Sequence, residues 1–213
     1  MIQEFKVYEE LFEEIDKKTS IKLDIYVIGG AALLYRGIKP ATKDIDIVVR
    51  TEEEFEELKK LLYDFGFTDS KNRNGYERLN LAIKVKRDDI EIDLFLNKIC
   101  SKFSFSHKML KRSEKVSSYD KVTVLLGSNE DIFAFKTITQ RPGDIDDCVA
   151  LAKRGLEWEI ILTEIKSQVE SSGQDIWITW INDRLIDLEE KGVEIPILDE
   201  TNRLSEKYYE SNL

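Results

Sequence analysis

The feature that most constrains the fold of this chain is a pair of adjacent glycines followed by a pair of aspartates. The stretch IGGAALLYRGIKPATKDIDIVV, residues 28–49, has Gly29 and Gly30 directly after an apolar run, and Asp44 and Asp46 lie inside a second one. Glycine adopts tight-turn backbone angles easily and lets amide groups approach a ligand. Aspartate is disfavoured in strands, so carboxylates among isoleucines and valines need a reason. Either they bind an ion or they lie on a solvated strand edge.

A third aspartate lies in a later segment that alternates between apolar and polar residues. In IEIDLF, residues 90–95, Asp93 projects from the face opposite the apolar residues. Strand residues two apart point to the same side, so the carboxylates of Asp44 and Asp46 are expected ~6–7 Å apart. If the strands of Asp46 and Asp93 are neighbours, three carboxylates converge beside the glycine turn and can share Mg²⁺ or Mn²⁺. The alternative is that each aspartate is only the polar half of an amphipathic strand.

Composition indicates a globular chain and argues against several functional classes. The 213 residues are 42% hydrophobic and 35% charged, which is typical of a folded protein rather than a disordered one. No apolar run approaches the ~18 residues that a membrane span needs. Two cysteines without zinc-like spacing give no disulfide framework, so a cytoplasmic location is expected.

Charge is distributed unevenly along the chain. The net charge of −10 argues weakly against a dedicated nucleic-acid binder, yet residues 71–115 contain 12 basic and 6 acidic side chains. This positive segment is either a pair of lysine-rich strands with solvated outer faces or a surface that meets polyphosphate or RNA.

Hydrophobic periodicity predicts an α/β fold with a mixed β-sheet flanked by helices in residues 1–127, and a C-terminal helical region in residues 128–213. In the first part we expect a helix over 3–18, a strand ending at Gly29, a short helix closed by Gly37, and a helix capped by Thr51. Further strands are expected at 45–49, 81–86, 90–95 and 121–126, the middle two forming a hairpin. The later helices are expected near 129–140, 144–155, 157–171, 175–190 and 199–210.

These motifs together resemble a known group of enzymes. Gly-Gly, a dozen or so residues, Asp-x-Asp on a strand and a third Asp on a later strand resemble the polymerase-β-type nucleotidyltransferase superfamily. Residues 29–49 are especially similar to its branch of AbiE-type abortive-infection toxins. EDIFAFKTITQRPGDIDDCVAL, residues 130–151, resembles the later helical motif of that branch, in which a Lys is followed by an Arg and then by Asp-x-x-Asp.

The resemblance implies a role for each matched residue. Gly29 and Gly30 hold the phosphates of an NTP, Asp44 and Asp46 bind both metal ions, and Asp93 completes the second metal site and helps to deprotonate the attacking hydroxyl. The remaining matched residues are expected to bind the nucleotide: Lys43, Lys136, Arg141, Asp144 and Asp147.

The sequence also departs from the family pattern and leaves alternatives for its second motif. Family members often have an Arg shortly before Asp-x-Asp, where this chain has Lys39 and Lys43, and lysine lacks the bidentate fork of arginine. Lys136 interrupts an apolar helical run, so without the resemblance it is as well explained by a side chain that reaches the surface. Asp144 and Asp147 follow Pro142-Gly143, where acids commonly cap a helix.

The resemblance implies metal-dependent transfer of a nucleoside monophosphate from an NTP to an acceptor hydroxyl, on an RNA 3′ end such as that of tRNA or on a protein side chain. It also implies a toxin of a toxin–antitoxin pair, with a cognate antitoxin docking on the acidic helical tail. The alternative is a non-catalytic interaction or regulatory protein of the same fold. Such a protein is expected to have lost a metal carboxylate, and all three are present in this sequence.

Overall fold

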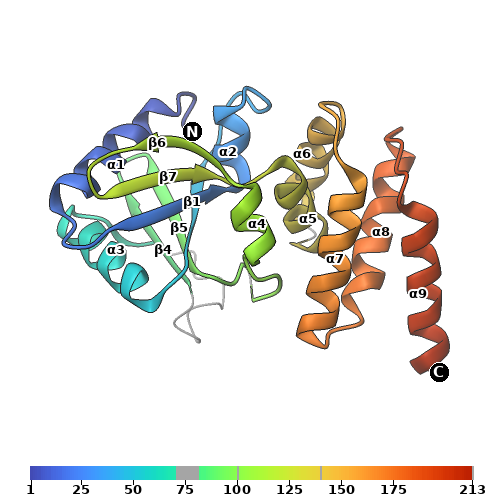
Figure 1. The fold of residues 1–213 in the computed structure, drawn as a ribbon. Helices are drawn as coiled ribbons and strands as arrows, with labels where there is room; N and C mark the ends of the chain where they lie inside the picture. Colours follow the sequence, from blue (N-terminus) through green and yellow to red (C-terminus); the bar gives the residue numbers. More distant parts are fainter. Residues whose placement is uncertain (71–81, 100, 140, 213) are drawn as a thin grey trace. The chain divides into compact units, whose positions relative to one another are not determined.

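The computed structural model describes residues 1–70, 82–99, 101–139 and 141–212. It divides into two compact units, Met1–Ser128 and Asn129–Leu213 (Figure 1). The first contains a mixed sheet with helices and the second is helical, which confirms the predicted fold class. Within the described ranges, no helix combines the length and apolar character needed to cross a membrane.

The first unit is built on one sheet. Its strands in the described residues are β1 (Leu23–Ile28), β2 (Asp44–Val49), β3 (Thr68–Asp69), β4 (Ala82–Arg87), β5 (Ile90–Leu96), β6 (Glu114–Ser118) and β7 (Val122–Leu126). Their order across the sheet is β3-β4-β5-β2-β1-β7-β6. The pairs β1–β7 and β2–β5 are parallel and the other neighbours are antiparallel, so the sheet is mixed.

Helices cover this sheet and connect its strands. They are α1 (Lys6–Lys18), α2 (Gly29–Tyr35), α3 (Glu52–Asp64) and α4 (His107–Arg112). Contacts of α1 with β7, of α3 with β5 and of the two helices with each other put both on one face of the sheet (Figure 1). Each buries an apolar stripe at helical spacing, including Leu11 and Phe12 on α1 and Phe55 and Leu58 on α3.

The register at the centre of the sheet determines which side chains share a face. In the parallel pair of β2 and β5, Asp46 lies opposite Asp93, and the alternate pairs of Ile45 with Ile92 and Ile47 with Leu94 are fully buried. Since residues directly opposite one another point to the same side, the aspartates lie on the face away from these isoleucines. Strands β2 and β5 therefore present buried apolar side chains on one face and the two aspartates on the other.

A tight hairpin sets the register of the next strand. Strands β4 and β5 are joined by Asp88 and Asp89, and Asp88 has a positive φ of 52°. Aspartate tolerates this conformation better than most residues, and two-residue hairpin loops often require it. The hairpin aligns Lys84 with Asp93.

The second unit is a helical cluster around α5 (Asn129–Thr139). The other helices are α6 (Pro142–Ala152), α7 (Trp158–Ser172), α8 (Trp177–Glu190) and α9 (Leu198–Asn212). Helix α5 packs against α6, α7 and α8, and its residues from Asp131 to Ile138 are buried. Phe133 meets Trp158 edge-to-face with ring centroids 5.3 Å apart, so this tryptophan is a packing residue.

The structure differs from the sequence prediction mainly at edges. The first helix begins at Lys6 rather than near residue 3, because Ile2 exchanges two main-chain hydrogen bonds with Thr42. Strands β3 and β6 were not predicted, since short edge strands have little apolar alternation. The predicted strand at 81–86 is present from Ala82, while residues 71–81 of the positive segment lie outside the described residues.

The predicted cap of α3 is present as a capping box. The Thr51 hydroxyl accepts from Glu54 N at 3.2 Å, and the Glu54 carboxylate accepts from Thr51 N at 2.9 Å. Thr51→Ala is expected to lower the free energy of unfolding by about 1 kcal/mol, because one helix N–H loses its partner. Urea titration measures this, with the exposed Lys60→Ala on the same helix as control. Equal losses for the two variants would contradict the capping role.

Candidate active site

The glycine turn is shaped around a carboxylate. Gly29, the first residue of α2, has a φ of +64°, a conformation that side chains rarely adopt. A Cβ built at Gly29 would overlap the Asp46 carboxylate. Only glycine meets both requirements, so the turn and the second aspartate of Asp-x-Asp form one arrangement.

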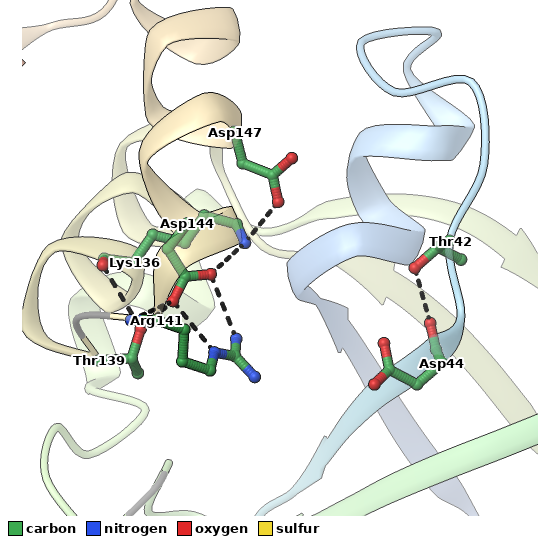
Figure 2. Close-up of polar contacts among 7 residues, drawn as sticks. All are labelled: Thr42, Asp44, Lys136, Thr139, Arg141, Asp144 and Asp147. Carbon is green, nitrogen blue, oxygen red and sulfur yellow. Dashed lines mark hydrogen bonds and ion pairs between the residues drawn. The ribbon is translucent and has the colours of Figure 1, made fainter.

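Gly30 is required for a second close approach. A Cβ there would lie 2.5 Å from Thr42 Oγ1 and 3.9 Å from Lys39 Nζ. The Thr42 hydroxyl donates to the main-chain oxygen of Asp44 at 3.1 Å (Figure 2), and the Thr42 main chain pairs with Ile2. The segment that leads into β2 is therefore fixed against the start of α2.

The three predicted carboxylates lie on one face of neighbouring strands. Asp44 and Asp46 are on β2, and Asp93 lies opposite Asp46 on β5. Asp46 is buried, whereas Asp44 and Asp93 are partly exposed, with 30% and 18% of their side chains accessible. The acid Glu91 lies opposite Asp44 and extends the same face. The structure thus brings together Gly29, Asp44, Asp46 and Asp93.

A lysine lies among these acids. Lys84 Nζ on β4 is 3.0 Å from Asp93 Oδ1, 3.4 Å from Glu91 Oε2 and 3.5 Å from Asp44 Oδ2. Burial disfavours the charged amine, but attraction to Asp93, Asp44 and Glu91 outweighs it and raises the pKa of Lys84. The ammonium therefore stays charged and offsets part of the negative charge of the face.

The donor set has the chemistry that a divalent metal requires. Carboxylate oxygens of Asp44, Asp46 and Asp93 are hard ligands of the kind that Mg²⁺ and Mn²⁺ prefer. In the present arrangement, no group of three acidic, histidine or cysteine side chains within the described ranges is set to hold an ion. The carboxylates of Asp44, Glu91 and Asp93 instead surround Lys84 Nζ. The three residues fit a metal chemically, and Lys84 contacts two of them, Asp44 and Asp93.

Other polar groups surround this face. Lys43, predicted to bind the nucleotide, directly precedes β2 with an exposed side chain, while Lys39 approaches Gly30. The buried Tyr8 hydroxyl on α1 has no hydrogen-bond partner in the described structure. Burial raises the pKa of Tyr8, and the nearby charges of Asp44 and Asp46 raise it further. Tyr8 is therefore a neutral donor close to the two carboxylates.

In the second unit, Lys136 joins the two acids of the later motif. Its Nζ is 2.9 Å from Asp144 Oδ1 and 2.7 Å from Asp147 Oδ2 (Figure 2). Only 5% of its side chain is accessible, so the alternative of a lysine that reaches the surface is wrong. Burial lowers the pKa of Lys136, but Asp144 and Asp147 more than compensate and raise it.

Asp144 organises the rest of this cluster. It accepts from Thr139 Oγ1 at 2.6 Å, from Arg141 Nε at 3.0 Å and from the Arg141 main-chain nitrogen at 3.3 Å. It therefore caps the start of α6 and pairs with Lys136 at the same time. Burial opposes its ionisation, but Lys136 and Arg141 hold the pKa of Asp144 at about 2. The Arg141 side chain is 55% accessible, so this guanidinium is the solvent-facing cation of the cluster.

Sequence reasoning missed Lys84, Glu91, Thr42 and Tyr8 as site residues. The first two had a usable signal, because a hairpin with Asp88-Asp89 as its loop aligns position 84 with 93 and 86 with 91. Tyr8 had none, since it occupies an ordinary core position of an amphipathic helix.

The glycine turn, the paired aspartates on β2 and the third aspartate on β5 thus lie together on the mixed sheet. Comparison with known proteins identifies the family. The family model described as "Nucleotidyltransferase of unknown function (DUF6036)" matches residues 6–176. The chain therefore belongs to this family and is a nucleotidyltransferase.

One solved structure supports the fold. The solution structure of the antibiotic-resistance factor ANT(2'')-Ia matches with a TM-score of 0.53 and 13% identity, over 79% of this chain and 92% of that one. A crystal structure of a proposed nucleotidyltransferase from Thermotoga maritima has a TM-score of 0.39 and 18% identity, over 59% of this chain and 80% of that one. A comparison with curated protein sequences finds no match.

The glycine turn yields a test with a matched control. Gly37 has the same φ of +64° as Gly29, but a Cβ there would meet nothing within 4 Å. Gly29→Ala is expected to lower the free energy of unfolding by ~1–3 kcal/mol more than Gly37→Ala, because Asp46 must move in addition to the backbone strain. Urea unfolding of both variants measures the difference. Equal losses would show that the approach of Asp46 to Gly29 is not a constraint.

The Lys136 cluster predicts a pH-dependent contribution to stability. Because the pKa of Asp144 is lowered from 3.8 to about 2 on folding, its ionised form stabilises the fold above pH 3.8, and this stability is lost as pH falls towards 2. Asp144→Asn is expected to cost about 3 kcal/mol near neutral pH. Wild type and variant should converge in acid.

Urea titration at a series of pH values measures the convergence. The exposed Asp183→Asn on α8 serves as the control and should change stability little at any pH. A loss for Asp144→Asn that is unchanged between neutral pH and pH 2 would contradict an ionised Asp144 in the folded state.

Proposed function

We propose that this nucleotidyltransferase moves a nucleoside monophosphate from an NTP to an acceptor hydroxyl, with Mg²⁺ or Mn²⁺ held by Asp44, Asp46 and Asp93. The observation that carries the proposal is the β2–β5 register, which aligns Asp46 with Asp93 on the face that Gly29 approaches. Phosphoryl-type transfer depends on positioning and charge neutralisation, and paired carboxylates on rigid strands suit both.

The reaction forms one bond and breaks one. The acceptor oxygen bonds to the α-phosphorus of the NTP, the bond from that phosphorus to the bridging oxygen of the leaving group breaks, and pyrophosphate departs. Bound divalent metal would supply charge neutralisation at the phosphates and align attacking and leaving oxygens. Asp93 would accept the proton of the acceptor hydroxyl, and Asp44 and Asp46 would hold the metal ions. The amides of Gly29 and Gly30 and the exposed Lys43 face the phosphates.

The later motif is assigned to the nucleotide. Arg141 offers the accessible charge, and its guanidinium is oriented by Asp144, as a phosphate-binding arginine requires. The same Asp144 belongs to a buried, paired cluster with Lys136 and Asp147. This assignment rests on the similarity of residues 130–151 to the later motif of the AbiE-type branch.

The class of acceptor and the biological role are proposed from features of the sequence. The excess of basic residues in 71–115 favours an RNA 3′ end such as that of tRNA, and a protein side chain is the other acceptor class. Similarity of residues 29–49 and 130–151 to the AbiE-type branch supports a toxin with a cognate antitoxin. Growth arrest on expression that depends on Asp44 and Asp46 would support that role, and unimpaired growth would oppose it.

Nucleotidyl transfer can be tested directly with each α-³²P-labelled NTP, Mg²⁺ and total tRNA or cell lysate. Asp44→Ala/Asp46→Ala is expected to reduce label on the macromolecule by more than the ~10–100-fold typical of losing an outer-shell partner of a metal. Glu52→Ala/Glu53→Ala removes the same charge from the exposed start of α3 and should transfer normally. Equal transfer by the aspartate double variant would refute the proposal. Absence of transfer by a folded wild type with every NTP would favour a non-catalytic binding protein.

A further inference from the structure

Lys84 occupies a position with an unusual combination of charge and geometry. Three acidic oxygens, from Asp44, Glu91 and Asp93, lie 3.0–3.5 Å from its ammonium, and only 18% of the side chain is accessible. Two of these acids, Asp44 and Asp93, are assigned to divalent metal in the proposed function. The Lys84 ammonium therefore contacts two of the carboxylates that hold the metal ion in the proposed function.

The lysine is tethered beside the site but not fixed in it. Its main chain is held in β4 by the antiparallel pairing with β5, opposite Asp93. Its side chain is a flexible four-carbon stem with a compact charged head, so the ammonium can leave the acids without any change of the strand. The ammonium carries a single charge and cannot accept ligands in the ordered shell that Mg²⁺ or Mn²⁺ forms.

An ammonium and a divalent ion cannot both occupy the space between Asp44 and Asp93. Without a cation the clustered carboxylates would repel one another, and with an ion in place a nearby ammonium would repel it. The Lys84 ammonium relieves the repulsion among the carboxylates, and it would itself repel a divalent ion bound there. Its presence therefore keeps the acids together while lowering the affinity for metal.

We propose that Lys84 is a tethered counter-cation that competes with divalent metal for Asp44 and Asp93 and moves aside when the ion and NTP bind. This inference rests on the metal site of the proposed function. Lys84 then lowers the affinity of the site for metal. An ion binds firmly only when NTP phosphates add further ligands and negative charge. A purely structural lysine on a polar strand face would not have this effect.

The test is a titration with Mn²⁺ in the absence of NTP. Electron paramagnetic resonance measures the free ion and so gives the amount bound. Lys84→Met keeps the length of the side chain and removes its charge. Lys86→Met is the matched control, because Lys86 lies two residues further on the same strand, with the same charge and an exposed side chain. Asp44→Asn/Asp93→Asn identifies the site at which binding occurs.

Lys84→Met is expected to bind Mn²⁺ about tenfold more tightly than wild type, and Lys86→Met to stay within about twofold, because only the former removes a charge in contact with the ligands. Unchanged or weaker binding by Lys84→Met would overturn the inference while leaving the metal site intact. If neither wild type nor Lys84→Met binds Mn²⁺ at Asp44 and Asp93, with or without NTP, the proposed metal dependence itself fails.

Thermal unfolding provides a second readout that does not depend on activity. In a chelator, Lys84→Met should melt at a lower temperature than wild type, because its carboxylates are no longer offset. Saturating Mn²⁺ should raise its melting temperature by more than that of wild type, since a tighter ligand stabilises more. Lys84→Gln is an alternative if the methionine variant does not fold. Equal Mn²⁺-induced shifts in wild type and variant would also overturn the competition.

Discussion

Repulsion between like charges on one sheet face is the constraint on which the site depends. The parallel register of β2 and β5 puts Asp46 beside Asp93 and Asp44 beside Glu91. Such an arrangement costs free energy unless a cation neutralises it. In this conformation the cation is Lys84, which the β4–β5 hairpin aligns with Asp93. The same face is suited to divalent metal because it needs positive charge.

A lysine held between carboxylates occurs in both units of the chain, with different consequences. Lys136 is almost fully buried and is paired with Asp144 and Asp147 at 2.9 and 2.7 Å, so it is a fixed structural charge. Lys84 is more accessible and its three contacts are longer, at 3.0–3.5 Å. Exposure and contact length therefore distinguish a lysine that organises a helical cluster from one that can yield to an ion.

Much of the fold could be predicted from sequence, because its central elements have strong local signals. Periodicity identified β2 and β5, and the Thr51 cap identified the start of α3. The edge strands β3 and β6 lacked such signals. For the site, the alternation of Asp93 with apolar residues predicted its face correctly. The pairing of Lys136 depends on tertiary packing of α5 and α6, and the helical pattern alone left its side chain equally compatible with the surface.

Anomalous diffraction from crystals containing Mn²⁺ and a non-hydrolysable NTP analogue would test the central claim, that Asp44, Asp46 and Asp93 form a metal site, most directly. An anomalous peak within ~2.0–2.3 Å of oxygens from these three side chains is expected for a hard divalent ion. The Lys84 ammonium should then have left Asp44 and Asp93. Lys84 still paired with both acids, with no peak at Asp44, Asp46 and Asp93 while the analogue is bound, would contradict the metal site.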